Sequence, residues 1–179
     1  MKLGLIGYPL GHSWSREIHN YLINCDYQMW PLRESELDEF FAKKDFDGLN
    51  VTIPYKQKVM EYLDEIDERA LRIKAVNCIV NDHGKLIGYN TDYDGFRQSL
   101  KNNGFLVKGE NVAILGSGGA SKACRAVIED EGGIVSIVSR HPAKGMISYE
   151  ELYQENFETV KKFSCLKNCL KIFVDRQTN

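Results

Sequence analysis

The stretch Gly48-Leu49-Asn50-Val51-Thr52-Ile53-Pro54-Tyr55-Lys56 decides the fold of this chain. Apolar and polar residues alternate along its first half, which is the two-residue period of a β-strand with one buried face. Pro54 ends this strand, because proline has no N–H group to donate to a neighbouring strand. The side chains of Asn50 and Thr52 therefore share one face at the carboxyl end of the strand, and Lys56 follows in the loop or the first helical turn.

This strand end is a candidate binding site for a small polar ligand. In open α/β sheets, ligands bind at the edge where the carboxyl ends of the strands lie. The amide of Asn50, the hydroxyl of Thr52 and the ammonium of Lys56 could together hold a polyhydroxy substrate and transfer a proton. An ordinary strand end with a lysine in solvent fits the same residues, so this stretch alone leaves both interpretations open.

Two serines near the amino terminus form a second candidate site. A short buried strand is predicted over residues 3–7, and a helix follows it. One side of this helix carries the apolar residues Ile18, Tyr21, Leu22 and Cys25. Ser13 and Ser15 lie at its start, where hydroxyls, N–H groups and the positive end of the helix dipole suit a carboxylate. Serines that only cap a helix produce the same pattern.

Strands and short helices alternate through the rest of the first half. The pattern predicts a strand over 27–32, a helix over 35–42 with Ser35 as its cap, a helical run from 55 to about 63, a solvated helix through 63–73 and a hairpin over 75–89. A helix over 94–100 comes next, and Asp92 stands just before it. Asp92 could cap this helix, or it could face the same cleft as Lys56.

The second half begins with a predicted nucleotide-binding unit. Asn102-Asn103-Gly104 marks a break, and we place a domain boundary there. A strand over 111–115 leads into Gly116-Ser117-Gly118-Gly119-Ala120-Ser121, a helix through about residue 131 and a second strand over 134–138. A strand, a glycine-rich loop, a helix and a second strand in this order are typical of the first half of a dinucleotide-binding fold.

The residues after the second strand bear on the choice of cofactor. An acidic side chain at this point would favour the ribose 2′-hydroxyl of NAD, whereas an arginine accommodates the 2′-phosphate of NADP. The chain has Arg140 here, with Ser139 before it and Lys144 nearby. NADP is therefore the predicted cofactor, although a single surface arginine is common.

Five sequence motifs together resemble those of the shikimate dehydrogenase family, whose members reduce 3-dehydroshikimate with NADPH. The matching segments are His12-Ser13-Trp14-Ser15, Asn50-Val51-Thr52-Ile53-Pro54-Tyr55-Lys56, Ala75-Val76-Asn77, Asn90-Thr91-Asp92 with Gly95, and the loop Gly116 to Ala120. The resemblance covers residues 1 to about 155. It implies an α/β chain with a substrate-binding domain of mostly parallel sheet over 1–102 and an incomplete Rossmann-like domain over 103–179.

The resemblance also implies a role for each of these residues. Ser13 and Ser15 would bind the substrate carboxylate, and Lys56 with Asp92 would form the catalytic pair. The residues that would hold the ring hydroxyls are Asn50, Thr52, Asn77 and Asp92. Those that would hold NADP are Gly116, Ser117, Gly118, Gly119, Ala120, Ser139 and Arg140. Hydride delivery to a ketone leaves a developing alkoxide, which an ammonium group stabilises and then protonates.

Some positions depart from the family pattern. Arg16 stands where the family commonly has proline, and Lys74 stands where glycine is usual. The cofactor segment reads Ser139-Arg140-His141 in place of Asn-Arg-Thr. The family continues with a further strand near Phe157, but the tail from Thr159 onward does not follow this pattern. We therefore expect a truncated or altered carboxyl end.

Composition narrows the classes of protein that remain. Of 179 residues, 43% are hydrophobic and 27% are charged, which is ordinary for a globular protein with a real core. The formal net charge of −2 gives no support for a nucleic-acid or anionic-membrane partner. The five cysteines include no Cys-x-x-Cys pair, so we expect neither a disulfide framework nor a metal site. The amino terminus lacks the layout of a signal peptide, and the predicted location is the cytoplasm.

Three functional hypotheses follow. The first is an NADP-dependent enzyme that makes shikimate for aromatic amino-acid biosynthesis, or a close relative that uses quinate and NAD. The second is a truncated protein that binds shikimate-like ligands with weak or no turnover. A nucleotide-binding module without a substrate site ranks last, because it leaves Ser13, Asn50, Lys56 and Asp92 unexplained. A half-built parallel sheet has an unpaired edge, so we also predict self-association of the chain.

Overall fold

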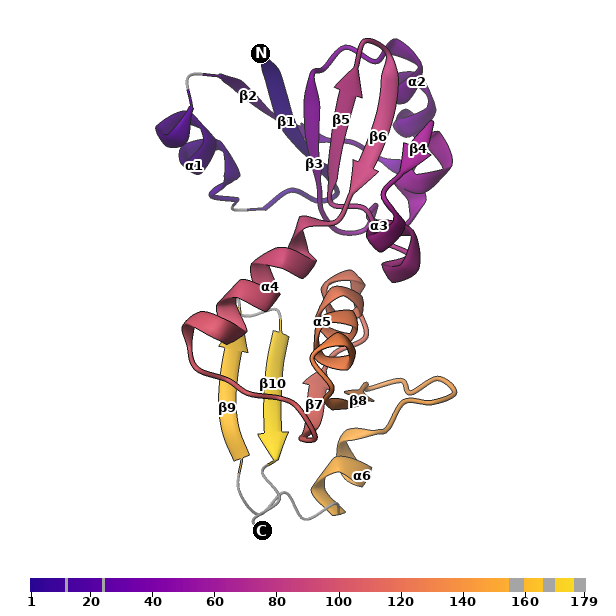
Figure 1. Cartoon of the computed structure of the whole chain (residues 1–179). Coiled ribbons are helices and arrows are strands. Elements are labelled where there is room, and N and C mark those ends of the chain that lie inside the picture. Colours follow the sequence, from indigo (N-terminus) through magenta and orange to yellow (C-terminus); the bar gives the residue numbers. More distant parts are fainter. Residues whose placement is uncertain (12, 24, 155–159, 166–169, 176–179) are drawn as a thin grey trace. The chain divides into compact units, whose positions relative to one another are not determined.

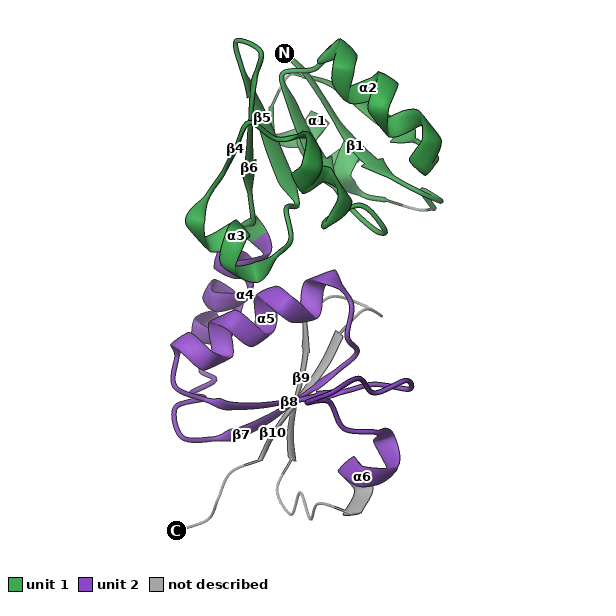
Figure 2. Cartoon of the chain, turned by 90° about the vertical axis from the view of Figure 1, so that its right-hand side faces the viewer, with its two compact units in different colours: residues 1–91 green, residues 92–179 purple. Residues whose placement is uncertain are grey.

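The computed structural model describes residues 1–179 except 12, 24, 155–159, 166–169 and 176–179, with side chains described up to residue 152. The chain divides into two compact units, Met1–Thr91 and Asp92–Asn179 (Figure 2). The boundary predicted between residues 102 and 103 lies one helix later, at the end of α4 (Thr91–Asn102). As a division between substrate and cofactor domains, it stays a prediction.

A six-stranded mixed sheet forms the first unit, with the strand order β2-β1-β3-β5-β6-β4 (Figure 1). The strands are β1 (Lys2–Gly7), β2 (Asp26–Pro31), β3 (Gly48–Val51), β4 (Glu65–Ile66), β5 (Cys78–Asp82) and β6 (Lys85–Tyr89). β1 runs parallel to both β2 and β3, and β4 runs parallel to β6. β5 is antiparallel to β3 and to β6, so the hairpin and the mostly parallel sheet are as predicted.

Short helices connect these strands. They are α1 (Ser15–Leu22), the 3₁₀ turn η1 (Glu34–Glu36), α2 (Leu37–Lys43), the 3₁₀ turn η2 (Lys58–Tyr62) and α3 (Glu68–Ile73). The solvated helix predicted from residue 63 is wrong in its first turn, which instead forms the edge strand β4. Leu86 N–H donates to the Asp64 carboxylate, and this bond fastens the segment to the sheet.

The hydroxyl of Ser13, one of the two candidate caps of α1, accepts the N–H of Ser15, the first residue of this helix, at 3.2 Å, and Trp14 stands directly before the helix. The helix cap predicted at Ser35 is wrong. At the start of η1, the Glu36 carboxylate accepts the N–H of Arg33 at 2.7 Å, so Ser35 is not the cap. A glutamate that reaches back by three residues satisfies the N–H of the residue that opens the helix, whereas a serine cap would accept an N–H inside the first turn.

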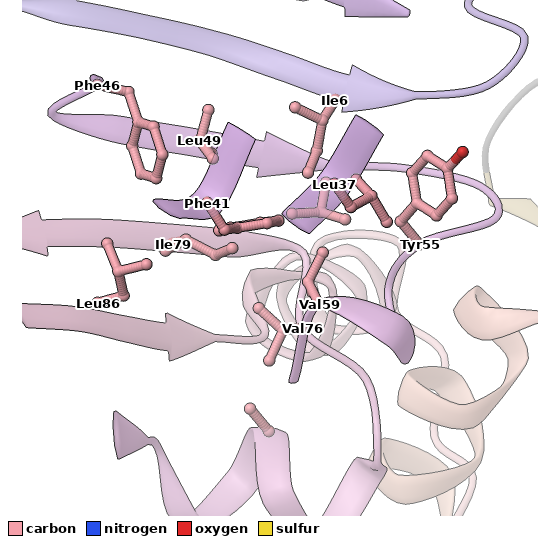
Figure 3. Packing of buried hydrophobic residues seen from close by; sticks show 12 residues of the cluster. Ile6, Leu37, Phe41, Phe46, Leu49, Tyr55, Val59, Val76, Ile79 and Leu86 are labelled. Atoms are coloured by element: carbon pink, nitrogen blue, oxygen red, sulfur yellow. The ribbon is translucent and has the colours of Figure 1, made fainter. Parts of the chain in front are cut away.

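The core of the first unit lies between the sheet and α2. Figure 3 shows strand residues meeting side chains of α2 and of the segment after β3. The buried cluster consists of Ile6, Leu37, Phe41, Phe46, Leu49, Val51, Tyr55, Val59, Ala70, Val76, Ile79 and Leu86. Leu49 and Val51 are buried while Asn50 between them is only half-buried, which confirms the predicted alternation up to Val51. The strand ends there, before Thr52 and Pro54, and the next apolar residue, Ile53, is 68% exposed.

A four-stranded sheet of order β8-β7-β10-β9 forms the second unit. Its elements are α4, β7 (Asn111–Leu115), α5 (Gly119–Asp130), β8 (Ile134–Val138), α6 (Tyr149–Gln154), β9 (Val160–Cys165) and β10 (Leu170–Asp175). β7 and β8 are parallel and α5 connects them, which confirms the predicted first half of a Rossmann-like domain. The further strand predicted near Phe157 lies outside the described residues.

The tail does not continue the parallel sheet. β10 pairs antiparallel with β7, and β9 pairs antiparallel with β10. In a dinucleotide-binding fold of order 3-2-1-4-5-6, the place beside the first strand belongs to the fourth, which runs parallel to it. β10 takes this place in the opposite direction, so the tail supplies a hairpin in place of the second half of the fold.

Candidate functional site

Backbone hydrogen bonds gather three predicted site residues at the end of β3, two for substrate binding and one for catalysis. Val51 N–H donates to the Asn77 carbonyl at 2.9 Å, so Asn77 lies beside the end of this strand. Val76 N–H donates to the Lys56 carbonyl at 2.7 Å, so Lys56 is tied to the same edge. The side chain of Lys56 is half-buried. Asn50, Lys56 and Asn77 therefore belong to one group, as the sequence predicted.

The end of β1 passes close to the same group. Thr52 N–H donates to the Ile6 carbonyl at 3.0 Å. A Cβ atom at Gly7 would lie only 2.5 Å from Cγ2 of Thr52, so a larger residue at this position would push the two segments apart. Tyr8 N–H donates to the Ile53 carbonyl at 3.1 Å, so the segment leading to the two serines starts beside the end of β3.

A chain of polar side chains joins the two serines to Asn50. The Ser13 hydroxyl donates to Oγ of Ser15 at 3.0 Å, and Oγ of Ser13 accepts the Ser15 N–H at 3.2 Å. The Ser15 side chain lies beside the phenol of Tyr27 and acts to lower its pKa. The Tyr27 hydroxyl in turn donates to Oδ1 of Asn50 at 2.8 Å. The candidate carboxylate site and the candidate hydroxyl site are therefore connected.

Sequence reasoning did not single out Tyr27. In the sequence it is an apolar-looking residue in a strand, and its side chain is indeed buried, with 4% exposed. Burial disfavours the charged phenolate and raises the pKa of Tyr27 to about 12. The phenol is therefore a neutral hydrogen-bond donor at neutral pH. Tyr27 is recognised as part of the candidate site only by the position of its hydroxyl. The spacing of apolar residues in the sequence does not reveal this position.

Asn77 also fixes the start of α4. Its Oδ1 accepts the backbone N–H of Thr91 at 2.8 Å and the Thr91 hydroxyl at 3.2 Å. The neighbouring Asn90 is buried and donates from Nδ2 to the Ala75 carbonyl. The helix predicted over 94–100 thus begins earlier, and Asp92 stands in its first turn rather than at its cap. Asp92 is the first residue of the second unit.

The predicted cofactor residues gather within the second unit. Gly116 has φ 116°, a conformation that only glycine adopts without strain, and its N–H donates to the Val138 carbonyl at 2.8 Å. The hydroxyls of Ser117 and Ser139 lie 3.4 Å apart, at the carboxyl ends of β7 and β8. Ser139 is buried and accepts the N–H of His141, and Arg140 between them is exposed.

The glycine-rich loop opens directly into α5. Gly118 precedes the helix, and no side chain caps its first N–H groups. A Cβ atom built on Gly116 or Gly118 meets nothing within 4 Å, so the space over the loop is open. Uncapped N–H groups at a helix start, with open space above them, suit the phosphates of a dinucleotide. Gly119 and Ala120 form the first turn of this helix.

The structure thus forms two groups of predicted residues. In the first unit lie Ser13, Ser15, Asn50, Thr52, Lys56 and Asn77, and in the second lie Asp92, Gly116 to Ala120, Ser139 and Arg140. Within the described part of the chain, no cluster of three or more His, Cys, Asp or Glu side chains could hold a metal ion. None of the described helices is long and apolar enough to cross a membrane.

Comparison with known proteins shows similarity over both units. The family model for the shikimate dehydrogenase substrate binding domain matches residues 5–79. A shikimate dehydrogenase (NADP(+)) from Halothermothrix orenii is 48% identical over 142 residues, which are 73% of this chain and 48% of that protein. The chain spans about half the length of this relative and of a second curated relative, of which it covers 52%.

A longer alignment joins the chain to a shikimate dehydrogenase (NADP(+)) from Clostridium botulinum. The two are 36% identical over 182 residues, covering 94% of this chain and 70% of that protein. The alignment therefore includes part of the tail beyond Thr159, which the sequence motifs did not match. A crystal structure of shikimate 5-dehydrogenase from Thermus thermophilus, in complex with NADP(H) and shikimate, has a TM-score of 0.72 and 28% identity, covering 82% of this chain and 61% of that one.

Proposed function

The chain belongs to the shikimate dehydrogenase family, and we propose that it catalyses the reversible, NADP-dependent reduction of 3-dehydroshikimate to shikimate. The observation that carries the proposal is the group of polar residues at the end of β3. The Ser13–Ser15 pair is connected through Tyr27 to Asn50, and Asn77 and Lys56 are held at the same strand end by backbone bonds. This arrangement suits a ring with a carboxylate at one side and hydroxyls at the other.

The proposed substrate contacts follow from the chemistry of each side chain. Ser13 and Ser15 offer hydroxyl donors to the carboxylate. Thr52 and Asn77 would contact ring hydroxyls, and so would the amide of Asn50, whose Oδ1 is already occupied by Tyr27. A site built from buried hydrogen-bonding groups discriminates strongly against ligands that lack the matching group.

Lys56 and Asp92 are the proposed catalytic pair. NADPH would supply the hydride to the substrate ketone. The Lys56 ammonium would stabilise the oxyanion that forms and donate the proton that completes the hydroxyl. Asp92 would orient the reacting hydroxyl and balance the charge of the ammonium. In the reverse direction the same two groups would take up the proton.

The cofactor proposal rests on the second unit. The open space over Gly116 and Gly118 and the uncapped start of α5 fit a pyrophosphate. Ser139 and Arg140 would hold the 2′-phosphate that distinguishes NADP from NAD. We also propose the cytoplasm as the location of the chain, as its sequence predicted.

The first test is shikimate-dependent reduction of NADP by the chain. We expect Lys56→Ala to lower turnover by at least about 100-fold, because a positioned proton donor contributes about 10²–10⁴-fold. Calorimetry should show shikimate binding weakened by no more than about tenfold, the loss of one hydrogen bond. Lys58→Ala is the matched control, since Lys58 stands two positions later and pairs with Glu61. Equal turnover in both variants would remove Lys56 from the mechanism.

One observation favours a second function. Because β10 runs antiparallel beside β7, the second half of the cofactor fold is not built as in a complete dinucleotide-binding domain. The chain would then be a shikimate-binding protein with weak or no turnover. Calorimetric binding of shikimate without binding of NADP would support this alternative. Quinate and NAD in the same assays would reveal a quinate/shikimate dehydrogenase.

A further inference from the structure

Tyr27 is the residue on which the contacts of α1 with β2 converge. α1 has no buried residue, so apolar packing does little to fix its position. The imidazole of His19 stacks on the Tyr27 ring, with centroids 4.3 Å apart and planes at 24°. Nε of Arg16 donates to the Tyr27 carbonyl at 3.2 Å, and the Ser15 side chain lies beside the phenol. Three residues of one helix thus contact a single residue of the sheet.

The hydroxyl of Tyr27 also determines how Asn50 presents its amide. Because the hydroxyl donates to Oδ1 at 2.8 Å, Oδ1 is occupied and Nδ2 is left as the donating end. Among the described residues, no acceptor for Asn50 Nδ2 is found. A rotated amide would face the phenol with its NH₂ group and offer a ligand an acceptor instead. One bond therefore decides which groups of a ligand Asn50 can recognise.

We propose that Tyr27 is a positioning residue for substrate binding, which orients the Asn50 amide as a donor next to the helix that begins with Ser15. The inference rests on the proposed function, since it assigns the carboxylate to Ser13 and Ser15 and a ring hydroxyl to Asn50. Tyr27 itself does not contact the substrate. It links the proposed carboxylate site at the two serines with the proposed hydroxyl site at Asn50. A ligand must therefore carry its carboxylate and its hydroxyl at the distance that separates these two sites.

The test compares Tyr27→Phe with Tyr55→Phe. Tyr55 is a matched control, because it is also buried in the first unit and its hydroxyl donates to the Leu32 carbonyl at 2.7 Å. We expect the calorimetric Kd for shikimate to rise at least about tenfold in Tyr27→Phe, equivalent to one oriented hydrogen bond. In Tyr55→Phe, the Kd should stay within about twofold of the unsubstituted chain.

A second measurement needs no ligand. The side-chain amide of Asn50 gives one pair of nitrogen–proton signals in an NMR spectrum of the unsubstituted chain. Tyr27→Phe should shift or double this pair, because the amide can then rotate, and Tyr55→Phe should leave it in place. Unchanged Asn50 signals in Tyr27→Phe, an unchanged Kd, or an equal rise of Kd in both variants would overturn the proposal.

The two measurements separate this proposal from the function on which it rests. If the unsubstituted chain binds no shikimate, the proposed function fails. The Asn50 signals then decide the role of Tyr27 by themselves, since a shift in Tyr27→Phe supports orientation of the amide and unchanged signals overturn it.

Discussion

Lys74 has a left-handed backbone conformation, with φ 57° and ψ 43°, where it ends α3. A side chain in this conformation brings its Cβ atom close to the following carbonyl oxygen, at a cost of about 1–2 kcal/mol. Glycine lacks Cβ and avoids this cost. This explains in physical terms why the related family usually has glycine immediately before its Ala-Val-Asn motif, and why lysine at this position is tolerated rather than favourable.

The strain at Lys74 predicts a stabilising substitution. We expect Lys74→Gly to raise the free energy of unfolding by about 0.5–1 kcal/mol, since relief of strain exceeds the added entropy of the unfolded chain. Lys74→Ala removes the same exposed side chain but keeps a Cβ atom, so the strain of the left-handed backbone conformation remains. This variant should leave the free energy of unfolding nearly unchanged. Urea unfolding would measure the change in free energy for both variants, provided that the dependence of this free energy on urea concentration stays the same. A lower midpoint for Lys74→Gly than for Lys74→Ala would contradict this account.

At the residue scale, sequence reasoning predicted residues for catalysis and binding, but it did not single out Tyr27, which contacts one of them. Asn50, Lys56 and Asn77 stand in short motifs next to a strand end, and the structure does gather them. Tyr27 was missed because its ring satisfies the same burial pattern as any core residue, and only the three-dimensional register brings its hydroxyl to Asn50. The catalytic role of Lys56 stays a prediction.

At the scale of elements, the loop after β8 shows how backbone contacts present an exposed side chain. The buried Ser139 hydroxyl donates to the His141 carbonyl and accepts the His141 N–H, both at 3.2 Å. These two bonds close a tight turn around Arg140, whose side chain is exposed. The turn stands beside the glycine-rich loop, because Ser139 and Ser117 meet through their hydroxyls. Arg140 therefore directly follows a residue that contacts the glycine-rich loop.

The turn predicts a change of cofactor preference. We expect Arg140→Ala to raise the Kd for NADP by about tenfold or more and to leave the Kd for NAD within about twofold, because only NADP carries the 2′-phosphate. Lys144→Ala is a suitable control, since this lysine is a nearby exposed cation outside the turn. Titration of each variant with NADP and with NAD would measure the two Kd values. A parallel loss of affinity for NADP and NAD would show that Arg140 does not read the phosphate.

Helices and strands were predicted well where the spacing of apolar residues fits only one kind of element. They were predicted poorly where contacts with other elements determine the structure. β7, α5 and β8 follow their predicted limits closely, whereas β3 ends at Val51, before the predicted stop at Pro54. The apolar side predicted for α1 is exposed instead of packed, with 51% of Ile18, 89% of Tyr21 and 68% of Leu22 accessible. A helical period shows that a face is apolar, but it does not show what covers that face.

At the scale of the whole molecule, several surfaces remain open within the described part of the chain. β9 is an outer strand of the second sheet, and β2 and β4 are those of the first. The outer edge of β8 is partly covered, since the N–H of Ile147 donates to the Ile137 carbonyl. Exposed apolar side chains add to the open surfaces, notably Trp14 with 74% and Leu106 with 77% accessible. Edge strands with unpaired N–H and C=O groups and exposed apolar residues both favour association between copies.

These surfaces support the self-association predicted from the sequence. In analytical ultracentrifugation, we expect a species heavier than the 20.5 kDa chain, with its fraction rising with protein concentration. The control is the same series in moderate urea, below the unfolding midpoint, where contacts between apolar surfaces weaken first. A single 20.5 kDa species at every concentration would count against self-association.

The central place of β1 in the first sheet sets the timing of its assembly during synthesis. Lys2–Gly7 is synthesised before both of its partners, residues 26–31 and Gly48–Val51. Pairing Leu3 with Gly48 closes a long loop, whereas β5 and β6 are joined by a short turn, and the entropy lost on closure grows with loop length. A strand at the centre of the sheet therefore has to wait during synthesis until both of its neighbours have been made.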